Sequence, residues 1–292
     1  MTTSISFQGK PLCSTGLTLG EGPTYDPANR TAWWFDIKGK ALHELHLPSG
    51  RKTVHDLPFM ASALARIDAG RQLVASEEGL FIRDAATGAL TLLTALEADK
   101  PGNRSNDGRV HQSGALWIGT MGKTAEDGAG AIYHVAGTTV TTLYTSISIP
   151  NSICFSPDGA TGYFTDSRAN KLMTVPLDPA TGLPRGEPKV LVEGEGMEGD
   201  FDGSVCDADG FIWNARWGDA AVDRYDPSGG HVERYALPAK QVTCPAFIGD
   251  GLDRLLVTSA RDGLGEDATD ADGQTFELGV TVKGRAEPDF RL

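Results

Sequence analysis

A turn followed by a strand-forming segment recurs six times along the chain, and this repeat limits the possible folds more than any other feature. Each copy has a turn rich in Gly, Asp or Asn before a run of β-branched or aromatic residues, and the copies begin at Asp26, Asp68, Gln112, Pro157, Asp207 and Gly249. Repeats of forty-odd residues built from short strands are typical of propeller blades, and no segment shows the pattern of a long amphipathic helix. We therefore expect an all-β chain that forms a six-bladed β-propeller, with four-stranded antiparallel blades around a central channel.

The composition indicates one folding unit. The 36 Gly, 16 Pro and strand-forming residues are spread evenly, without a linker or a low-complexity tract, so we expect residues 1–292 to form a single β-propeller domain. The last repeat is irregular after Arg261. We expect an N-terminal strand near residues 3–10 to join the final blade, because this closure removes an exposed sheet edge. A sandwich or a large barrel is the alternative all-β fold.

The charge and the chain start restrict the partners and the location. With 39 acidic and 26 basic residues the formal net charge is −13, which repels nucleic acid and anionic membrane surfaces. The first sixteen residues lack the basic and apolar regions of a secretory signal, and no stretch approaches the roughly 18 apolar residues of a membrane span. We therefore expect a cytoplasmic protein that binds neither nucleic acid nor a membrane. Its four scattered cysteines are expected to be reduced thiols.

The repeats share a polar position, which points to a binding site. The count starts at the turn glycine of each repeat, or at Asn29 in the first repeat. Eight residues before it there is one polar residue per unit, and these are here called the ring residues: Glu21, Ser62, Asn106, Asn151, Asp202 and Thr243. The first strand of a propeller blade is innermost, so these side chains would surround one mouth of the channel. Three of them, Glu21, Asn151 and Asp202, carry oxygen donors that suit a hard divalent cation and leave coordination positions open. The alternative is that such residues only cap strands and turns.

Five motifs in order along the chain resemble those of the SMP-30/gluconolactonase/regucalcin-like (LRE) family of metal-dependent sugar lactonases. They are LGEGP (19–23), NRSNDG (103–108), PNSICFSPDG (150–159), FDGSVCDADG (201–210) and WNARWGDAAVDRYDP (213–227). The resemblance implies that Glu21, Asn151 and Asp202 bind a metal, and that Arg104 and Asn106, with Asn103 in the same motif, bind substrate. The chain departs from the family at Phe201, where a proline is usual, and at Lys123 and Thr124, where some relatives are acidic.

The predicted activity is metal-dependent hydrolysis of a sugar lactone to the aldonic acid, with Asp202 as the catalytic residue that orients or deprotonates water. The predicted cofactor is one divalent ion, Ca²⁺ first, with Zn²⁺, Mn²⁺, Mg²⁺ or Fe²⁺ as alternatives. The partner is then a small sugar lactone. Two other functions are compatible with the same residues: a calcium-binding regulatory protein of regucalcin type, and a phosphotriesterase or arylesterase on the same propeller.

A cluster of basic residues is expected where the second strands return to the channel mouth. Counting along each unit places Lys123, Arg168, Arg216 and Arg261 there. Such a cluster would attract an anion, so Lys123 and Arg216 are candidate substrate-binding residues for a lactone with an additional anionic group. The alternative is that these cations pair with Asp36, Glu77 and Asp166, which return to the same rim.

Overall fold

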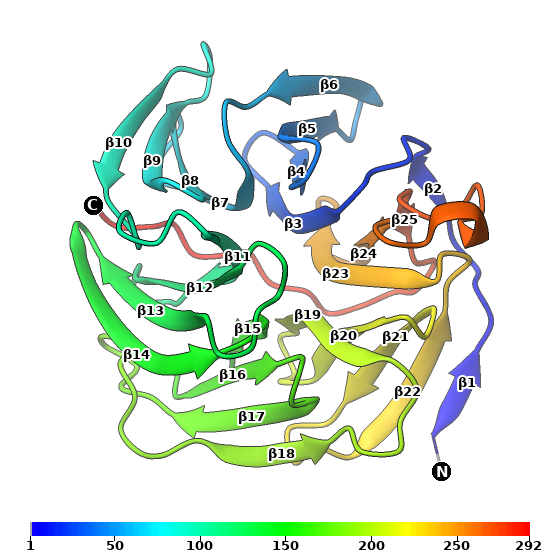
Figure 1. The fold of residues 1–292 in the computed structure, drawn as a ribbon. Helices are drawn as coiled ribbons and strands as arrows, with labels where there is room; N and C mark the ends of the chain where they lie inside the picture. The colour runs from blue at the N-terminus through cyan, green and yellow to red at the C-terminus, as the bar shows by residue number, and fades with distance from the viewer. Residues whose placement is uncertain (1) are drawn as a thin grey trace.

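Residues 2–292 are described by the computed structural model, and their regular structure is almost entirely β-strand (Figure 1). Six strands lie innermost, and each contacts the next in a closed cycle: β3 (Gly20–Asp26), β7 (Ala61–Arg66), β11 (Asn103–Val110), β15 (Pro150–Phe155), β19 (Asp200–Cys206) and β23 (Gln241–Ile248). Each pairs with a second strand: β4 (Thr31–Asp36), β8 (Arg71–Ser76), β12 (Leu116–Gly122), β16 (Thr161–Asp166), β20 (Ile212–Trp217) and β24 (Arg254–Ala260).

The remaining strands lie further out. They are β5 (Ala41–His46), β6 (Arg51–Asp56), β9 (Gly79–Asp84), β10 (Leu90–Thr94), β13 (Gly130–Ala136), β14 (Thr139–Ile147), β17 (Lys171–Pro176), β18 (Lys189–Glu193), β21 (Ala221–Tyr225), β22 (His231–Ala236) and β25 (Thr275–Glu277). The N-terminal strands are β1 (Thr3–Ile5) and β2 (Lys10–Cys13), and η1 (Gly265–Asp267) is a 3-10 turn. Within residues 2–292 no helix has the length and apolar character needed to cross a membrane.

The prediction of six separate four-stranded blades is wrong. Four sheets have that form, β3–β6, β7–β10, β11–β14 and β15–β18, and the other nine strands form one sheet. The pairing of Trp217 in β20 with Gln241 in β23 joins two units into this larger sheet, and the N-terminal strands β1 and β2 extend it. The spacing of the repeats locates the turns, but it does not show which strands form hydrogen bonds with each other. The sequence pattern therefore could not distinguish two repeats that share one sheet from two repeats that form separate sheets. The chain is an all-β propeller with four separate four-stranded blades.

The N-terminus joins this sheet at two places. Strand β2 pairs antiparallel with β25, whereas β1 pairs with β22. The pairing expected for residues near 3–10 is thus made by Lys10–Cys13, and the residues before them extend a different part of the sheet.

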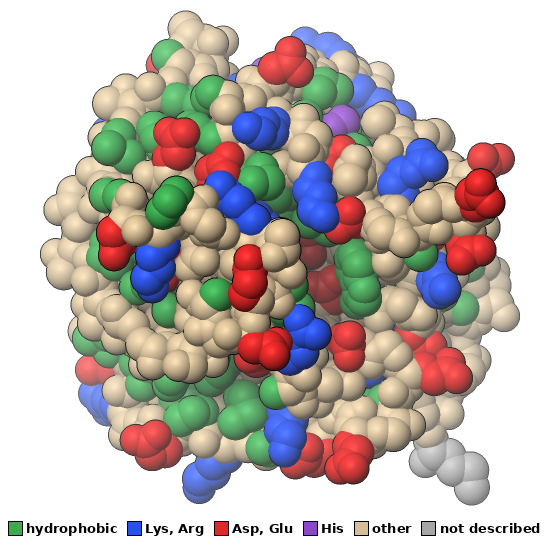
Figure 2. All heavy atoms as spheres, viewed as in Figure 1, with side chains coloured by type: hydrophobic (Ala, Val, Ile, Leu, Met, Phe, Trp, Pro, Cys, Tyr) green, Lys and Arg blue, Asp and Glu red, His purple; other side chains and the backbone are tan. Residues whose placement is uncertain are grey.

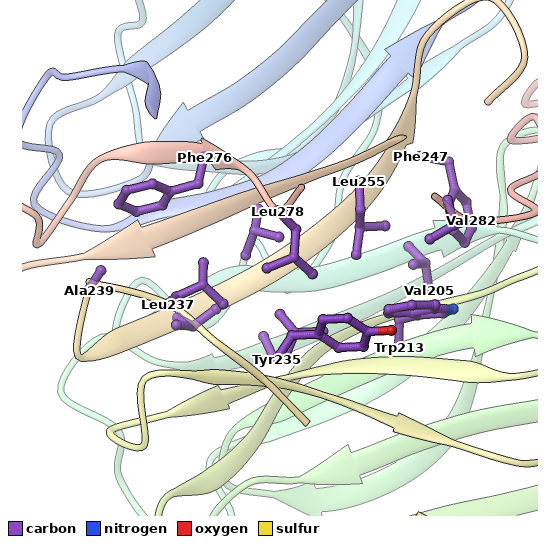
Figure 3. Packing of buried hydrophobic residues seen from close by; sticks show 14 residues of the cluster. Val205, Trp213, Tyr235, Leu237, Ala239, Phe247, Leu255, Phe276, Leu278 and Val282 are labelled. Carbon is purple, nitrogen blue, oxygen red and sulfur yellow. The ribbon is translucent and has the colours of Figure 1, made fainter. Parts of the chain in front are cut away.

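Burial follows the position of each strand in its sheet. Strand β4, with the sequence TAWWFD, is buried along its whole length, because neighbouring sheets cover both of its faces. The outermost strand of the same sheet, β6, carries RKTVHD and has a mostly exposed face. Figure 3 shows one such interface, in which Trp213 and Tyr235 pack near Phe247, Leu255 and Val282. The four cysteines are free thiols, and all four are buried.

The C-terminal segment, residues 278–292, passes across the ends of the innermost strands and runs behind the ring in Figure 1. Arg285 Nε donates to Cys206 O at 3.0 Å, and Glu287 pairs with Arg109 at 2.5 Å. Asp289 pairs with Arg66 at 2.7 Å, and the Phe290 side chain is buried. The segment therefore ties β7, β11 and β19 together at the end opposite to the ring residues.

Asp223 of β21 is a buried charge in the nine-stranded sheet, and basic side chains pair with it. Arg234 donates to both of its carboxylate oxygens, at 2.7 and 2.9 Å, and His231 Nε2 lies 3.1 Å from Oδ1. Burial alone would raise the pKa of Asp223, but His231 and Arg234 lower it to about 2. A lowered pKa means that folding favours the ionised form, so the stabilisation is present above about pH 4 and is lost as the pH falls towards 2.

An Asp223→Asn variant is therefore expected to lose about 2–3 kcal/mol of unfolding free energy at pH 7. Arg234 loses its charged acceptor and keeps only its salt bridge with Asp219, and the buried Arg216 loses the carboxylate that lies 3.8 Å away. The difference from the wild type should shrink between about pH 4 and pH 2, where the wild-type carboxylate itself becomes protonated. Urea unfolding at several pH values measures both effects. The control is Asp209→Asn, which breaks the exposed pair with Lys283 and should cost less than about 1 kcal/mol. An equal cost for both variants would contradict this interpretation.

Candidate functional site

Each of the six innermost strands carries a β-bulge beside its ring residue. In β3 the register shifts between Glu21 and Thr24, and in β15 it shifts between Asn151 and Cys154. The other four strands shift at the equivalent place: Ala61/Ala63, Ser105/Gly108, Phe201/Ser204 and Val242/Pro245. A bulge adds one residue to one strand and redirects its side chain. The bulges are therefore placed to redirect side chains of the innermost strands near the channel mouth.

The motif LGEGP contains the glycine that the first bulge requires. Gly22, directly after Glu21, has φ of 55°, and a Cβ there would collide with the carbonyl oxygen of Ser62. Ser152, directly after Asn151, adopts a similar φ of 57°, which is unusual for a residue with a side chain. Such strained backbone is kept where the surrounding structure holds it, as at functional sites.

Four of the six ring residues line one cavity of about 210 Å³, together with Arg104: they are Glu21, Asn106, Asn151 and Asp202. These five side chains come from β3, β11, β15 and β19, and each residue is less than 8% exposed. Figure 2 shows a hollow near the centre of this face, with acidic side chains inside it and basic ones around it. The structure thus brings together all three predicted metal ligands and two of the predicted substrate-binding residues.

The other two ring residues, Ser62 and Thr243, hold neighbouring strands together. Ser62 Oγ donates to Asn106 O at 2.5 Å, and Thr243 Oγ1 donates to Gly20 O at 2.6 Å. Both hydroxyl groups are buried and neither side chain lines the cavity. Short hydroxyl side chains at these positions therefore fix the spacing of the innermost strands beside Glu21 and Asn106.

A chain of hydrogen bonds orients the amide groups in the cavity. Arg104 Nη1 donates to Asn106 Oδ1 at 2.7 Å, and Asn106 Nδ2 donates to Asn151 Oδ1 at 3.0 Å. Asn151 Nδ2 then donates to Ser167 Oγ at 2.9 Å, and Ser167 Oγ donates to Phe201 O at 2.6 Å. The Asn151 amide is held at both ends, and its oxygen, an acceptor with two lone pairs, keeps one of them free.

The cavity concentrates negative charge in a buried place. Burial, and then the charge of Asp107, raises the pKa of Glu21, and burial with the charge of Glu21 raises the pKa of Asp202. Burial also lowers the pKa of Arg104, to about 10. Arg104 is the single basic residue among those that line the cavity in the described part of the chain. Two buried carboxylates that act on each other's charge therefore line one cavity with one guanidinium, an arrangement that a dication would stabilise.

Glu21, Asn151 and Asp202 are the residues that could hold a metal. Among residues 2–292 no group of three or more His, Cys, Asp or Glu side chains is placed to hold one. A metal in this cavity would therefore need the Asn151 oxygen in addition to the two carboxylates. Such an all-oxygen donor set is typical of hard cations.

Three predicted substrate-binding residues lie outside the lining of the cavity. Asn103 donates to Glu97 Oε2 at 2.8 Å, and Lys123 forms a salt bridge of 2.6 Å with Glu77. Arg216 is fully buried, and its Nη2 donates to the carbonyl oxygens of Glu198 and Gly199.

The other two members of the expected basic rim are likewise absent from the residues that line the cavity. Arg168 contacts Asp127 and donates to Ala125 O, and Arg261 is not part of the cavity lining. Pairing with a rim carboxylate, the alternative considered from the sequence, occurs for Lys123 with Glu77. Asp36 and Asp166 instead accept hydrogen bonds from backbone N–H groups, such as those of Leu19 and Ile149.

Sequence reasoning missed several residues of the cavity. Asp200, Trp217 and Asp262 line it, and the buried Asp107 lies close enough to raise the pKa of Glu21. Asp107 accepts a hydrogen bond from Ile153 N at 2.7 Å, so it joins β11 to β15. Asp200 and Asp107 are each within two residues of a ring residue, and this proximity along the strand was the available signal.

Comparison with known proteins identifies the family. The model of the SMP-30/gluconolactonase/LRE-like region matches residues 19–261. A Rhizobium meliloti (strain 1021) protein with the provisional name sugar lactone lactonase is 60% identical over the full length of both chains. The L-arabinolactonase of Azospirillum brasilense is 36% identical, covering 89% of this chain and 87% of that protein.

A solved structure with a similar sequence has the same fold as this chain. The crystal structure of a calcium-binding protein, regucalcin, from Agrobacterium tumefaciens str. C58 superposes with a TM-score of 0.98, at 63% identity and over the full length of both chains. The family that the five motifs resemble is thereby confirmed. The chain belongs to the SMP-30/gluconolactonase/LRE-like family.

Proposed function

We propose that this chain hydrolyses a sugar lactone to the aldonic acid, with a divalent cation held by Glu21, Asn151 and Asp202. The observation that carries the proposal is the convergence of these three buried oxygen donors, from three bulged strands, on the same cavity as Arg104. The names of the similar proteins support the substrate class, since the A. brasilense relative is an L-arabinolactonase. The calcium-binding relative supports Ca²⁺ as the first cation to test.

The residues present fit such a cation. Gly22 N donates to Glu21 Oε2 at 2.8 Å, which leaves the second oxygen of this carboxylate to bind. Asn151 keeps one lone pair, and no side chain in residues 2–292 donates a hydrogen bond to the Asp202 carboxylate. Two negative charges and one neutral oxygen balance a charge of +2, and three protein ligands leave room for water and substrate.

The mechanism adds water to the lactone carbonyl carbon. When bound, a divalent cation supplies electrostatic stabilisation for the negative charge that develops on the carbonyl oxygen. Asp202 orients the attacking water and accepts its proton as the new carbon–oxygen bond forms. The bond between the carbonyl carbon and the ring oxygen then breaks, and the ring oxygen takes the proton from Asp202 and becomes a hydroxyl group, which restores the carboxylate. Arg104 donates to substrate oxygens, while Asn106 keeps Arg104 and Asn151 in position.

The calcium-binding relative favours a second candidate function, the binding of calcium without turnover. One experiment separates the two. The protein is stripped with a chelator and assayed on neutral aldonolactones, an aryl ester and a phosphotriester, with Ca²⁺, Mg²⁺, Mn²⁺, Zn²⁺ or Fe²⁺ added back. We expect hydrolysis to be lost with chelator and restored by a divalent ion, with the highest kcat/KM on a lactone. Calcium binding without hydrolysis would support the second candidate, and preference for another ester would contradict the proposed substrate class.

A Glu21→Gln variant tests the metal ligands directly. The change keeps the shape and one oxygen but removes a charge, so the metal Kd should rise at least about tenfold. Calorimetric titration of metal into the stripped protein measures this. Glu44→Gln is the control, because Glu44 lies on β5, away from the cavity, and should leave the Kd unchanged. Unaltered affinity in Glu21→Gln would exclude Glu21 as a ligand.

A further inference from the structure

The carboxylates that line the cavity differ in whether a basic side chain pairs with them. Besides Arg104, its charged lining consists of four carboxylates: Glu21, Asp200, Asp202 and Asp262. Glu21 and Asp202 are the most buried of these four carboxylates and are the proposed metal ligands. Asp262 forms a salt bridge of 2.6 Å with Lys38. Asp200 is therefore the cavity carboxylate that is neither a proposed metal ligand nor directly paired with a basic side chain among residues 2–292.

Asp200 is open to the solvent. It is the first residue of β19, opposite Trp217 in register, and it is exposed, whereas Phe201 and Asp202 after it are buried. Within residues 2–292 no hydrogen bond or salt bridge engages its carboxylate. The charges of Arg216 and Arg168 act on Asp200 without direct contact. Arg216 donates to Glu198 O and Gly199 O, and Arg168 pairs with Asp127.

The proposed reaction changes the charge of the molecule in the cavity. A sugar lactone is neutral, whereas the hydroxy acid that forms from it ionises with a pKa near 4 and is an anion at neutral pH. The acid keeps the hydroxyl groups of the lactone, and its carboxylate is a better ligand for a cation than the ester was. A site that binds the lactone would therefore retain its own product unless another group opposes the new charge.

We infer that Asp200 is a specificity-determining residue that weakens binding of the ionised acid product, and of anionic lactones, relative to the neutral lactone. The inference rests on the proposed function and deepens it. Repulsion between two carboxylates at the partly solvated mouth of a cavity corresponds to an about three- to tenfold change in affinity and is screened by salt. A neutral lactone carries no net charge and is not subject to this repulsion.

The test is product inhibition of lactone hydrolysis at saturating metal, compared between wild type, Asp200→Asn and Asp200→Glu. We expect the ratio of the product inhibition constant to the KM of the lactone to fall about three- to tenfold in Asp200→Asn and to be kept in Asp200→Glu. Asp56→Asn removes the same charge from the outer strand β6 and should leave the ratio unchanged. In the wild type, raising the salt concentration to about 1 M should lower the ratio, since the repulsion is then screened.

The outcomes separate this inference from the proposed function. If the wild type opens no lactone with any metal, the proposed function fails. If it opens lactones but the ratio is the same in Asp200→Asn as in the wild type, the role of Asp200 is refuted. Should Asp200→Asn not fold, the salt dependence of wild-type inhibition decides, and a ratio indifferent to salt would overturn the inference.

Discussion

An Asp202→Asn variant is expected to lose at least about 100-fold in kcat at saturating metal, while retaining its fold. The substitution keeps the size of the side chain and one oxygen, but it removes the charge and the proton acceptor that the proposed mechanism uses. Because burial and the charge of Glu21 raise the pKa of Asp202, the ionised form is unfavourable in the metal-free protein. The metal-free variant should therefore be at least as stable as the metal-free wild type at neutral pH, and this can be measured by thermal unfolding.

Asp262→Asn is a matched control for this prediction. Asp262 lines the same cavity, but its charge is compensated by Lys38, and it is not a ring residue. It should lose much less turnover than Asp202→Asn. Steady-state kinetics with metal concentrations well above the Kd of each variant keep metal affinity apart from catalysis. Near-normal kcat in Asp202→Asn under these conditions would show that water is oriented or deprotonated by another group.

An Arg104→Ala variant is expected to lose about 2–4 kcal/mol in kcat/KM, which corresponds to roughly 30- to 1,000-fold. Arg104 lines the cavity, where its Nη1 donates to Ser105 O and Asn106 Oδ1. Its Nη2 makes no hydrogen bond within residues 2–292 and is not among the buried unpaired atoms, so it can donate to a substrate oxygen. Metal affinity should change little, because the hydrogen bond between Asn106 and Asn151 does not require Arg104.

The control is Arg104→Lys, which retains the charge but not the planar set of donors. If Arg104 acts through directed hydrogen bonds, the lysine variant should recover only part of the lost kcat/KM. Calorimetric titration of metal into both variants checks that the cavity is intact. Unchanged kinetics in Arg104→Ala, or a protein that no longer folds, would indicate that Arg104 is structural and does not contact the substrate.

The positions that line the channel could be predicted because they depend on regular spacing. The turns recur in phase, so counting from them located Glu21, Asn151 and Asp202, and the structure places all three at bulges around one cavity. The bulges themselves could be anticipated only at Gly22, where glycine permits a positive φ. At Ser152 the same backbone conformation occurs without any residue that signals it.

The partners of long charged side chains could not be predicted in the same way. Lys123 and Arg216 are at the expected distance along their strands, but each side chain bends to the nearest acceptor, Glu77 for one and the carbonyl of Gly199 for the other. The pairing of Trp217 with Gln241 is a further contact between separate repeats. Such contacts depend on how one repeat is oriented relative to the next. The residue pattern within a single repeat carries no information on this orientation.

The pairing of β2 with β25 sets the order in which the molecule can be completed during protein synthesis. Cys13 leaves the ribosome about 260 residues before its partner Thr275, and at 5–20 residues per second this delay lasts roughly 13–50 s. The edge that β2 will cover does not exist in that interval, and the segment after β25 that ties the innermost strands together emerges later still. A nascent chain of this protein therefore carries an unpaired β2 segment until β25 has emerged, and during that interval the segment is open to proteases and to edge-to-edge association.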